Sequence, residues 1–147
     1  MSKSILKKQG GFTLLELLIV IVIIGILALL IIPNITSAPK KARDTKRKTD
    51  ITTIRKGLEE YFVNNNSYPA ALTALESGSA PIIKAVPTDP KNTAPFTYTY
   101  ATASSNTTYT LSACLENDQD SGDSVMAASA SNNTSCTGKV FQLVNGN

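Results

Sequence analysis

Histidine and tryptophan are absent from this 147-residue sequence, and only two of its residues are cysteine. Histidine is the commonest general base near neutral pH and the commonest metal ligand in proteins. Its absence excludes the usual histidine-based catalytic and metal sites, and the sequence has no glycine-rich phosphate-binding loop either. The composition therefore argues against an enzyme, and we expect a protein without catalytic activity.

An excess of one charge sign is also lacking once the N-terminal residues are set aside. The whole chain carries a net charge of +3, from 14 basic and 11 acidic side chains. Residues 1–11 hold three of the lysines, so the rest of the chain has 11 basic and 11 acidic side chains. The overall charge therefore gives no argument for a nucleic-acid partner.

The charges are nevertheless unevenly placed along the chain. Residues 40–56 contain eight basic and two acidic side chains, whereas the residues from Gly57 onward contain eight acidic and three basic ones. The basic run allows three interpretations: a face next to anionic lipid, a surface that pairs with acidic residues of an adjacent subunit, or contact with DNA. Its most closely spaced members are Lys40, Lys41, Arg43, Lys46, Arg47 and Lys48.

The sequence has a single long apolar run, residues 12–32, in which only Glu16 is charged. At about 1.5 Å per residue, a helix of this length spans roughly 30 Å, the thickness of a bilayer core. A carboxylate in lipid is costly without a partner, and no second apolar span is present to supply one. We therefore expect a partner on another molecule, and hence assembly. The lysines before the run, which favour a cytoplasmic N-terminus, are Lys3, Lys7 and Lys8.

Both cysteines, Cys114 and Cys136, fall in the part of the chain that this orientation places outside the cytoplasm. In an oxidising compartment such a pair favours a disulfide over two free thiols. Closing the loop between them would stabilise the fold by roughly 3 kcal/mol on the chain-entropy model.

Hydrophobic periodicity predicts one long, interrupted helix over about 12–64, with weak points at Gly25, Pro33 and Pro39. In its second half the apolar residues fall on one face, which we expect to pack on a small domain. These residues are Ile51, Ile54, Leu58, Tyr61 and Phe62.

The C-terminal half of the chain carries strand signals. Residues 96–100 alternate between aromatic residues and threonine, and further strands are predicted over 107–114 and 139–144. A connector over 67–95 precedes them, with a short helix near its start. The predicted fold class is α+β: a long N-terminal helix packed on a small antiparallel sheet of three or four strands.

A specific motif surrounds the start of the apolar run. A basic leader ends in Gly10 and Gly11, Phe12 follows, and Glu16 is the fifth residue counted from Phe12. An ordinary secretory signal has its cleavage site after the apolar stretch, whereas here the small residues come before it. Together with Gly25 and Pro33, this pattern resembles the type IV pilin and pseudopilin family. A weaker resemblance extends through residues 50–69 and the Pro-x-Asp-Pro element at 87–90.

The resemblance implies roles for individual residues. A prepilin peptidase would cut after Gly11, and Phe12 would become an N-methylated N-terminus. Glu16 would form an assembly salt bridge with the Phe12 amine of a neighbouring subunit. The helix would loosen between Gly25 and Pro33 when the subunit enters a filament.

The resemblance also divides the chain into four segments of the type IV pilin fold. We expect a leader peptide over 1–11 and a transmembrane and filament-core helix over 12–35. The amphipathic second half of the helix follows over 36–66, and a globular head with the cysteine-bounded loop occupies 67–147.

One acidic loop raises the question of a metal. Asp118, Asp120 and Asp123 gather around Gly122, and carboxylates at alternate positions suit a hard cation such as Ca²⁺. Major pseudopilins of the family hold calcium in a C-terminal loop, but the full EF-hand template is missing here. We expect no other cofactor, and a solvated acidic loop is the alternative that we favour.

The resemblance implies a structural subunit, and we expect the major pilin of a type IV pilus. The alternatives are a pseudopilin of a type II secretion system and, in a different class, a minor tip pilin that binds DNA or a surface. The partners would be further copies in a helical filament, the prepilin peptidase and an inner-membrane assembly platform. The protein would lie in the inner membrane before assembly and in an extracellular filament afterwards.

Overall fold

The computed structural model describes residues 11–103, 105–131, 133 and 135–145. The leader lysines at positions 3, 7 and 8 lie outside the described residues. The chain divides into two compact units, Met1–Thr36 and Ser37–Asn147, and we describe each by itself.

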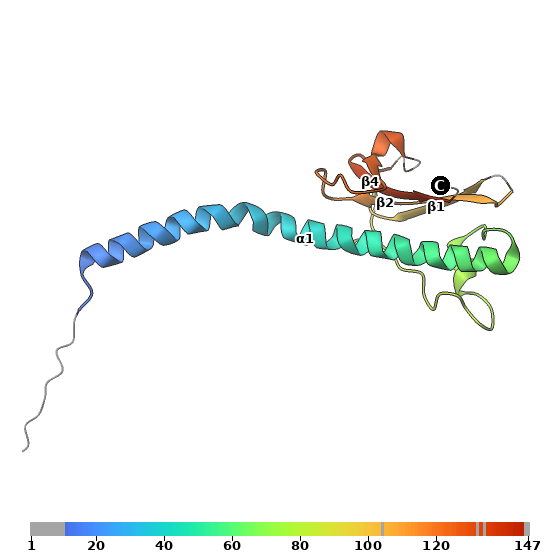
Figure 1. Ribbon diagram of the computed structural model, residues 1–147, viewed down its shortest axis with the longest axis horizontal. Coiled ribbons are helices and arrows are strands. Elements are labelled where there is room, and N and C mark those ends of the chain that lie inside the picture. Colours follow the sequence, from blue (N-terminus) through green and yellow to red (C-terminus); the bar gives the residue numbers. More distant parts are fainter. Residues whose placement is uncertain (1–10, 104, 132, 134, 146–147) are drawn as a thin grey trace, which may run out of the picture. The chain divides into compact units, whose positions relative to one another are not determined.

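A single helix, α1 (Leu14–Asn65), confirms the long N-terminal helix predicted from the apolar periodicity. It is the blue-to-green coil of Figure 1. The helical backbone continues through Gly25, Pro33 and Pro39, so the predicted interruption is not seen in α1. A proline within a helix removes one donor, and the flanking turns retain their own hydrogen bonds. Among the described residues, no helix combines the length and the apolar character needed to cross a membrane.

The head contains a four-stranded sheet in which every neighbouring pair is antiparallel. Its spatial order is β1-β2-β4-β3. The bounds are β1 (Tyr98–Ala103), β2 (Thr108–Leu115), β3 (Val125–Ala127) and β4 (Lys139–Val144). The α+β class is therefore confirmed, and three strands lie within a few residues of their predicted positions. The short strand β3 was not predicted, because it interrupts an otherwise polar stretch.

The hydrophobic core of the head lies between the sheet and the second half of α1 (Figure 1). Ile51, Ile54 and Leu58 of α1 are fully buried, as their helical spacing predicted. They share one cluster with alternate residues of β2, which point to the same side of the sheet. Those β2 residues are Tyr109, Leu111, Ala113 and Leu115.

The connector between α1 and β1 includes a short 3₁₀ helix, η1 (Leu72–Glu76), close to the predicted one. Beyond it, Ile83 packs against α1 at Gly57, where an added Cβ would lie 2.5 Å from the Ile83 Cδ1 atom. The missing side chain of Gly57 therefore lets this loop approach the helix backbone.

The opposite face of the sheet is partly covered by the loop between β3 and β4, which includes η2 (Ala128–Ala130). The predicted disulfide joins Cys114 of β2 to Cys136 of this loop. Both cysteines are buried in a small second cluster together with Val140 of β4. The disulfide thus attaches the loop to the face of the sheet that points away from α1.

Candidate functional site

The N-terminus of α1 is closed by reciprocal hydrogen bonds between Thr13 and Glu16. The Glu16 amide donates to Thr13 Oγ1 at 3.2 Å, and the Thr13 amide donates to Glu16 Oε2 at 2.9 Å. The Thr13 hydroxyl also donates to Glu16 Oε2, at 2.8 Å. This is a capping box, which satisfies amide groups that a helix otherwise leaves unpaired. This second role of Glu16 was not predicted from the sequence, although Thr-x-x-Glu before an apolar run is the signature of a capping box.

The first half of α1 presents a continuous apolar surface. The large hydrophobic side chains of Phe12, just before the helix, and of α1 as far as Leu29 are exposed, from 46% at Val20 to 87% at Phe12. Soluble monomers rarely expose so much contiguous apolar surface, and large patches mark contacts with lipid or with other protein. The predicted partner of Glu16, the Phe12 amine of a neighbour, stays a prediction. The loosening between Gly25 and Pro33 stays a prediction as well.

In the head, a buried arginine connects three separate segments of the chain. Arg47 of α1 is 0% exposed, and its guanidinium donates four hydrogen bonds to carboxylates. Two go to Asp89, from Nε at 2.6 Å and from Nη2 at 3.0 Å. The Nη1 atom serves both Asp44 and Glu116, each at 2.8 Å. We call these four residues the Arg47 network.

Two of the three carboxylates of the Arg47 network, Asp44 and Asp89, also bind backbone amides. Asp44 accepts hydrogen bonds from the amides of Glu116 and Asn117, just beyond β2. Asp89 accepts from the amide of Lys91 at 2.8 Å and so closes the turn of the Pro-x-Asp-Pro element. The network therefore holds the loop before β1 and the end of β2 against one turn of α1.

Charge around Glu116 is balanced by three cations. Besides Arg47, it pairs with Arg43 Nε at 2.7 Å and with Lys91 Nζ at 2.9 Å. The Arg43 guanidinium, together with Lys91 and Arg47, holds the pKa of Glu116 well below its usual range. For Arg47, burial lowers the pKa, but the hydrogen bonds to Asp89, Glu116 and Asp44 outweigh burial and raise it. The Phe96 ring lies beside this site, 4.7 Å from the Arg47 Cζ atom.

Four of the eight basic side chains of the run on α1 pair with acidic residues of the same chain. Besides Arg43 and Arg47, Lys46 pairs with Asp50 at 3.1 Å and Lys48 pairs with Asp120 at 2.6 Å. This differs from the three interpretations made from sequence, which sought lipid, another subunit or DNA as the partner. The acidic second half of the chain folds back onto the basic run, because the sheet packs along α1.

Tyrosine hydroxyls also anchor the head to α1. Tyr68 and Tyr109 each donate to one oxygen of Glu59, both at 3.0 Å. Tyr98 of β1 donates to Asp50 Oδ2 at 2.8 Å, and burial together with this bond raises the pKa of its phenol. The tyrosines at alternate positions of β1 therefore face the helix.

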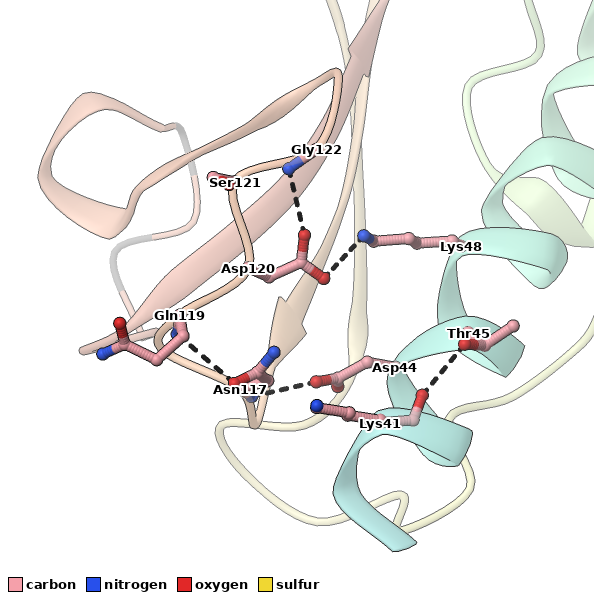
Figure 2. A pocket seen from close by; sticks show the side chains of 9 residues that line it. All are labelled: Lys41, Asp44, Thr45, Lys48, Asn117, Gln119, Asp120, Ser121 and Gly122. Atoms are coloured by element: carbon pink, nitrogen blue, oxygen red, sulfur yellow. Dashed lines mark hydrogen bonds and ion pairs between the residues drawn. The ribbon is translucent and has the colours of Figure 1, made fainter. Parts of the chain in front are cut away.

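The three carboxylates proposed for calcium lie in different surroundings. Asp120 faces a cavity of about 390 Å³ beside α1 and pairs with Lys48 there (Figure 2). Asp118 lines another cavity, together with Gly138, and Asp123 is exposed. Within the described part of the chain, no group of three or more His, Cys, Asp or Glu side chains is arranged to hold a metal ion. These three carboxylates are therefore not gathered at one point in the described structure, and the calcium site stays a prediction.

Two family models match the chain. Residues 6–32 match the prokaryotic N-terminal methylation motif, and residues 34–132 match type II secretion system (T2SS), protein G. The second match covers the second half of α1 and most of the head.

Curated relatives agree with the second model. Type II secretion system core protein G of Pseudomonas aeruginosa is 42% identical over 71 residues, which cover 48% of this chain and 50% of the relative. The protein of the same name from Escherichia coli strain K12 is 46% identical over 70 residues, 48% of each chain. That of Vibrio cholerae is 39% identical over 87 residues, 59% of this chain and 58% of the relative. The chain thus spans about half the length of these relatives.

The matched family model and the curated relatives distinguish between the functions predicted from sequence. They support the secretion pseudopilin, which was the alternative, and the major pilin of a type IV pilus is not confirmed. The predicted absence of catalytic activity agrees with the structural role of the matched family. The match to the protein G model over 34–132, more than half of the chain, shows that the chain belongs to the type II secretion system protein G family of pseudopilins.

Proposed function

We propose that the mature protein is a pseudopilin subunit of a type II secretion filament. The observation that carries this proposal is the pair of adjacent matches, a methylation motif over 6–32 and a protein G domain over 34–132. A processed N-terminus and an assembling head are the two parts that such a subunit needs.

Processing prepares the subunit for assembly. A prepilin peptidase removes residues 1–11 by cutting after Gly11, and the new amine of Phe12 is then methylated. Before assembly, the carboxylate of Glu16 is held by Thr13 in the capping box. The Phe12 amine of an adjacent copy then supplies a positive charge that Thr13 lacks. An ammonium and a carboxylate that are each costly in lipid offset one another when paired.

The exposed apolar surface of α1 supports a transfer of this helix from lipid to a filament. We assign residues 12–35 to the inner membrane before assembly, with the N-terminus on the cytoplasmic side. On assembly, an inner-membrane platform transfers the subunit into a periplasmic filament of further copies. There the apolar side chains between Phe12 and Leu29 contact neighbouring helices instead of lipid.

A head that is fixed on α1 gives the filament a regular outer surface. The Arg47 network and the Glu59 bonds to two tyrosines connect the head to α1 at separate points. These contacts lie within each subunit and hold the head on the second half of α1. A head that moved freely on its helix would not repeat in register.

Deletion of the gene in the source organism tests the proposal. We expect secretion of folded exoproteins to fail while surface pili remain, and the wild-type gene to restore secretion. Mass spectrometry of the complemented strain should find an N-terminus that begins at methylated Phe12. Normal secretion together with loss of surface pili would instead identify the type IV pilin.

Abundance separates a major subunit from a tip subunit. Overproduced filaments should consist mainly of this chain if it is the major pseudopilin. A filament preparation that contains only traces of it would identify a minor tip subunit, for which binding to DNA or a surface would then be measured.

A further inference from the structure

The loop that follows β2 is tied to α1 by charged side chains from the helix. At its start, Asp44 accepts hydrogen bonds from the amides of Glu116 and Asn117. Three residues further on, Lys48 Nζ lies 2.6 Å from Asp120 Oδ2. Asp44 and Lys48 are four positions apart, so both point from the same side of α1 toward the loop (Figure 2).

The Lys48–Asp120 pair is partly buried, and both oxygens of its carboxylate have partners. The side chains are only 30% and 17% exposed, and the second Asp120 oxygen accepts the Gly122 amide at 3.1 Å. Both carboxylate oxygens therefore have partners, one a cation and the other a backbone donor. The Lys48 ammonium also lies 5.8 Å from the centre of the Phe141 ring.

A calcium ion in this loop would need a different arrangement. Calcium takes six to eight oxygen ligands at 2.3–2.6 Å, so several carboxylate, carbonyl or water oxygens must converge on one point. Here Asp118 and Asp120 line different cavities, and the Asp120 oxygens are already engaged. A lysine ammonium needs only one carboxylate as its partner. Lys48 of α1 lies within hydrogen-bonding distance of Asp120 and so supplies this ammonium.

We propose that Lys48 is a built-in cation that takes the place of calcium and holds residues 117–122 against α1. The order of the loop then depends on this ion pair and on Asp44, and not on free calcium. The proposal concerns the head alone and stands whether or not the filament serves secretion.

Calcium titration of the full chain in detergent micelles tests the first half of the proposal. The protein is stripped with a chelator and titrated with CaCl₂, with MgCl₂ as the ionic-strength control. We expect the same melting temperature and the same rate of proteolytic cleavage within 117–124 in all three conditions. A higher melting temperature and slower cleavage with calcium alone, both lost in Asp120→Asn, would overturn the proposal.

Variants test the second half. Lys48→Met keeps the length of the side chain and removes the charge, and we expect it to speed cleavage within 117–124 several-fold. Lys56→Met is the matched control, since Lys56 is an exposed lysine of the same helix. It should leave the cleavage rate unchanged. An unchanged rate in Lys48→Met would overturn the proposal.

A double-mutant cycle tests the ion pair even if any substitution near the loop speeds its cleavage. Lys48→Met and Asp120→Asn should each speed cleavage, and the double variant should be no faster than either one, because both remove the same interaction. Additive effects of the two changes would show that the residues act separately, and this would also overturn the proposal.

Discussion

The Arg47 guanidinium holds the Asp89 carboxylate through two hydrogen bonds, although the residues lie 42 positions apart in the chain. Both side chains of this pair are fully buried. A planar guanidinium and a carboxylate match each other's geometry, which makes such a pair directional as well as strong. It sets the Pro-x-Asp-Pro loop at a defined turn of α1.

Loss of the Arg47 guanidinium should strongly destabilise the head. In Arg47→Met, three buried carboxylates lose a shared donor, and breaking a buried ion pair costs about 3–5 kcal/mol. Chemical denaturation of the full chain in detergent measures the change in the free energy of unfolding. Arg55→Met, at an exposed position of the same helix, is the control and should change it by less than about 0.5 kcal/mol. Equal effects of the two substitutions would contradict a special role for Arg47.

Stability should fall in acid because of Glu116. Arg43, Lys91 and Arg47 hold its pKa below the ordinary value of 4.5. A carboxyl group whose pKa is depressed by folding stabilises the fold above the unfolded-state pKa and loses this effect as the pH falls toward the folded-state pKa. The free energy of unfolding should therefore decline below about pH 4.5.

Glu116→Gln is the control for this pH dependence, because its amide does not titrate. The variant should be less stable near neutral pH and should lose less stability on acidification. The same acid slope in both proteins would assign the effect to other carboxylates.

Removal of the disulfide should loosen the loop between β3 and β4. Cys114 and Cys136 are 22 positions apart, and opening a loop of this size costs about 3 kcal/mol on the chain-entropy model. The double variant Cys114→Ala/Cys136→Ala should melt at a lower temperature than the oxidised wild type. A reducing agent should lower the melting temperature of the wild type and leave the double variant unchanged. A wild type that does not respond to the reductant would count against a stabilising bond.

Glu16→Ala should separate processing from assembly. Cleavage after Gly11 should continue, while filaments should be absent or sparse, because the Phe12 amine of a neighbour loses its carboxylate partner. Mass spectrometry of the N-terminus and electron microscopy of sheared filaments measure the two steps. Thr13→Ser keeps a hydroxyl for the capping box and should assemble normally. Normal filaments from Glu16→Ala would remove the assembly role.

Local signals were sufficient for much of the fold. The periodicity of Ile51, Ile54 and Leu58 predicted the buried face of α1, and the alternation in 96–100 predicted a strand, which the structure has as β1. Such patterns are readable because backbone geometry alone fixes which residues share a face. β3 escaped notice because three residues are too few to show a period.

The ion pairs could not be predicted in the same way. The sequence showed a basic run and an acidic second half, but it did not show which basic and acidic side chains form ion pairs. Arg47, Asp89 and Glu116 come from three segments, and only the packing of the sheet on α1 brings them within hydrogen-bonding distance. The sequence did not show that Lys48 lies near the acidic loop, so the loop alone raised the question of calcium. In the fold, Lys48 pairs with Asp120 of this loop.

The sequence by itself therefore determined the processing motif at Gly11 and Phe12, the long helix and the class of the fold. These features depend on neighbouring residues and on regular spacing, which a linear chain displays directly. Only the tertiary structure decided that half of the basic run is paired within the chain and that Lys48 pairs with Asp120 of the acidic loop. Contacts between distant segments depend on how the sheet packs on the helix, and no local sequence pattern encodes which of these segments come together.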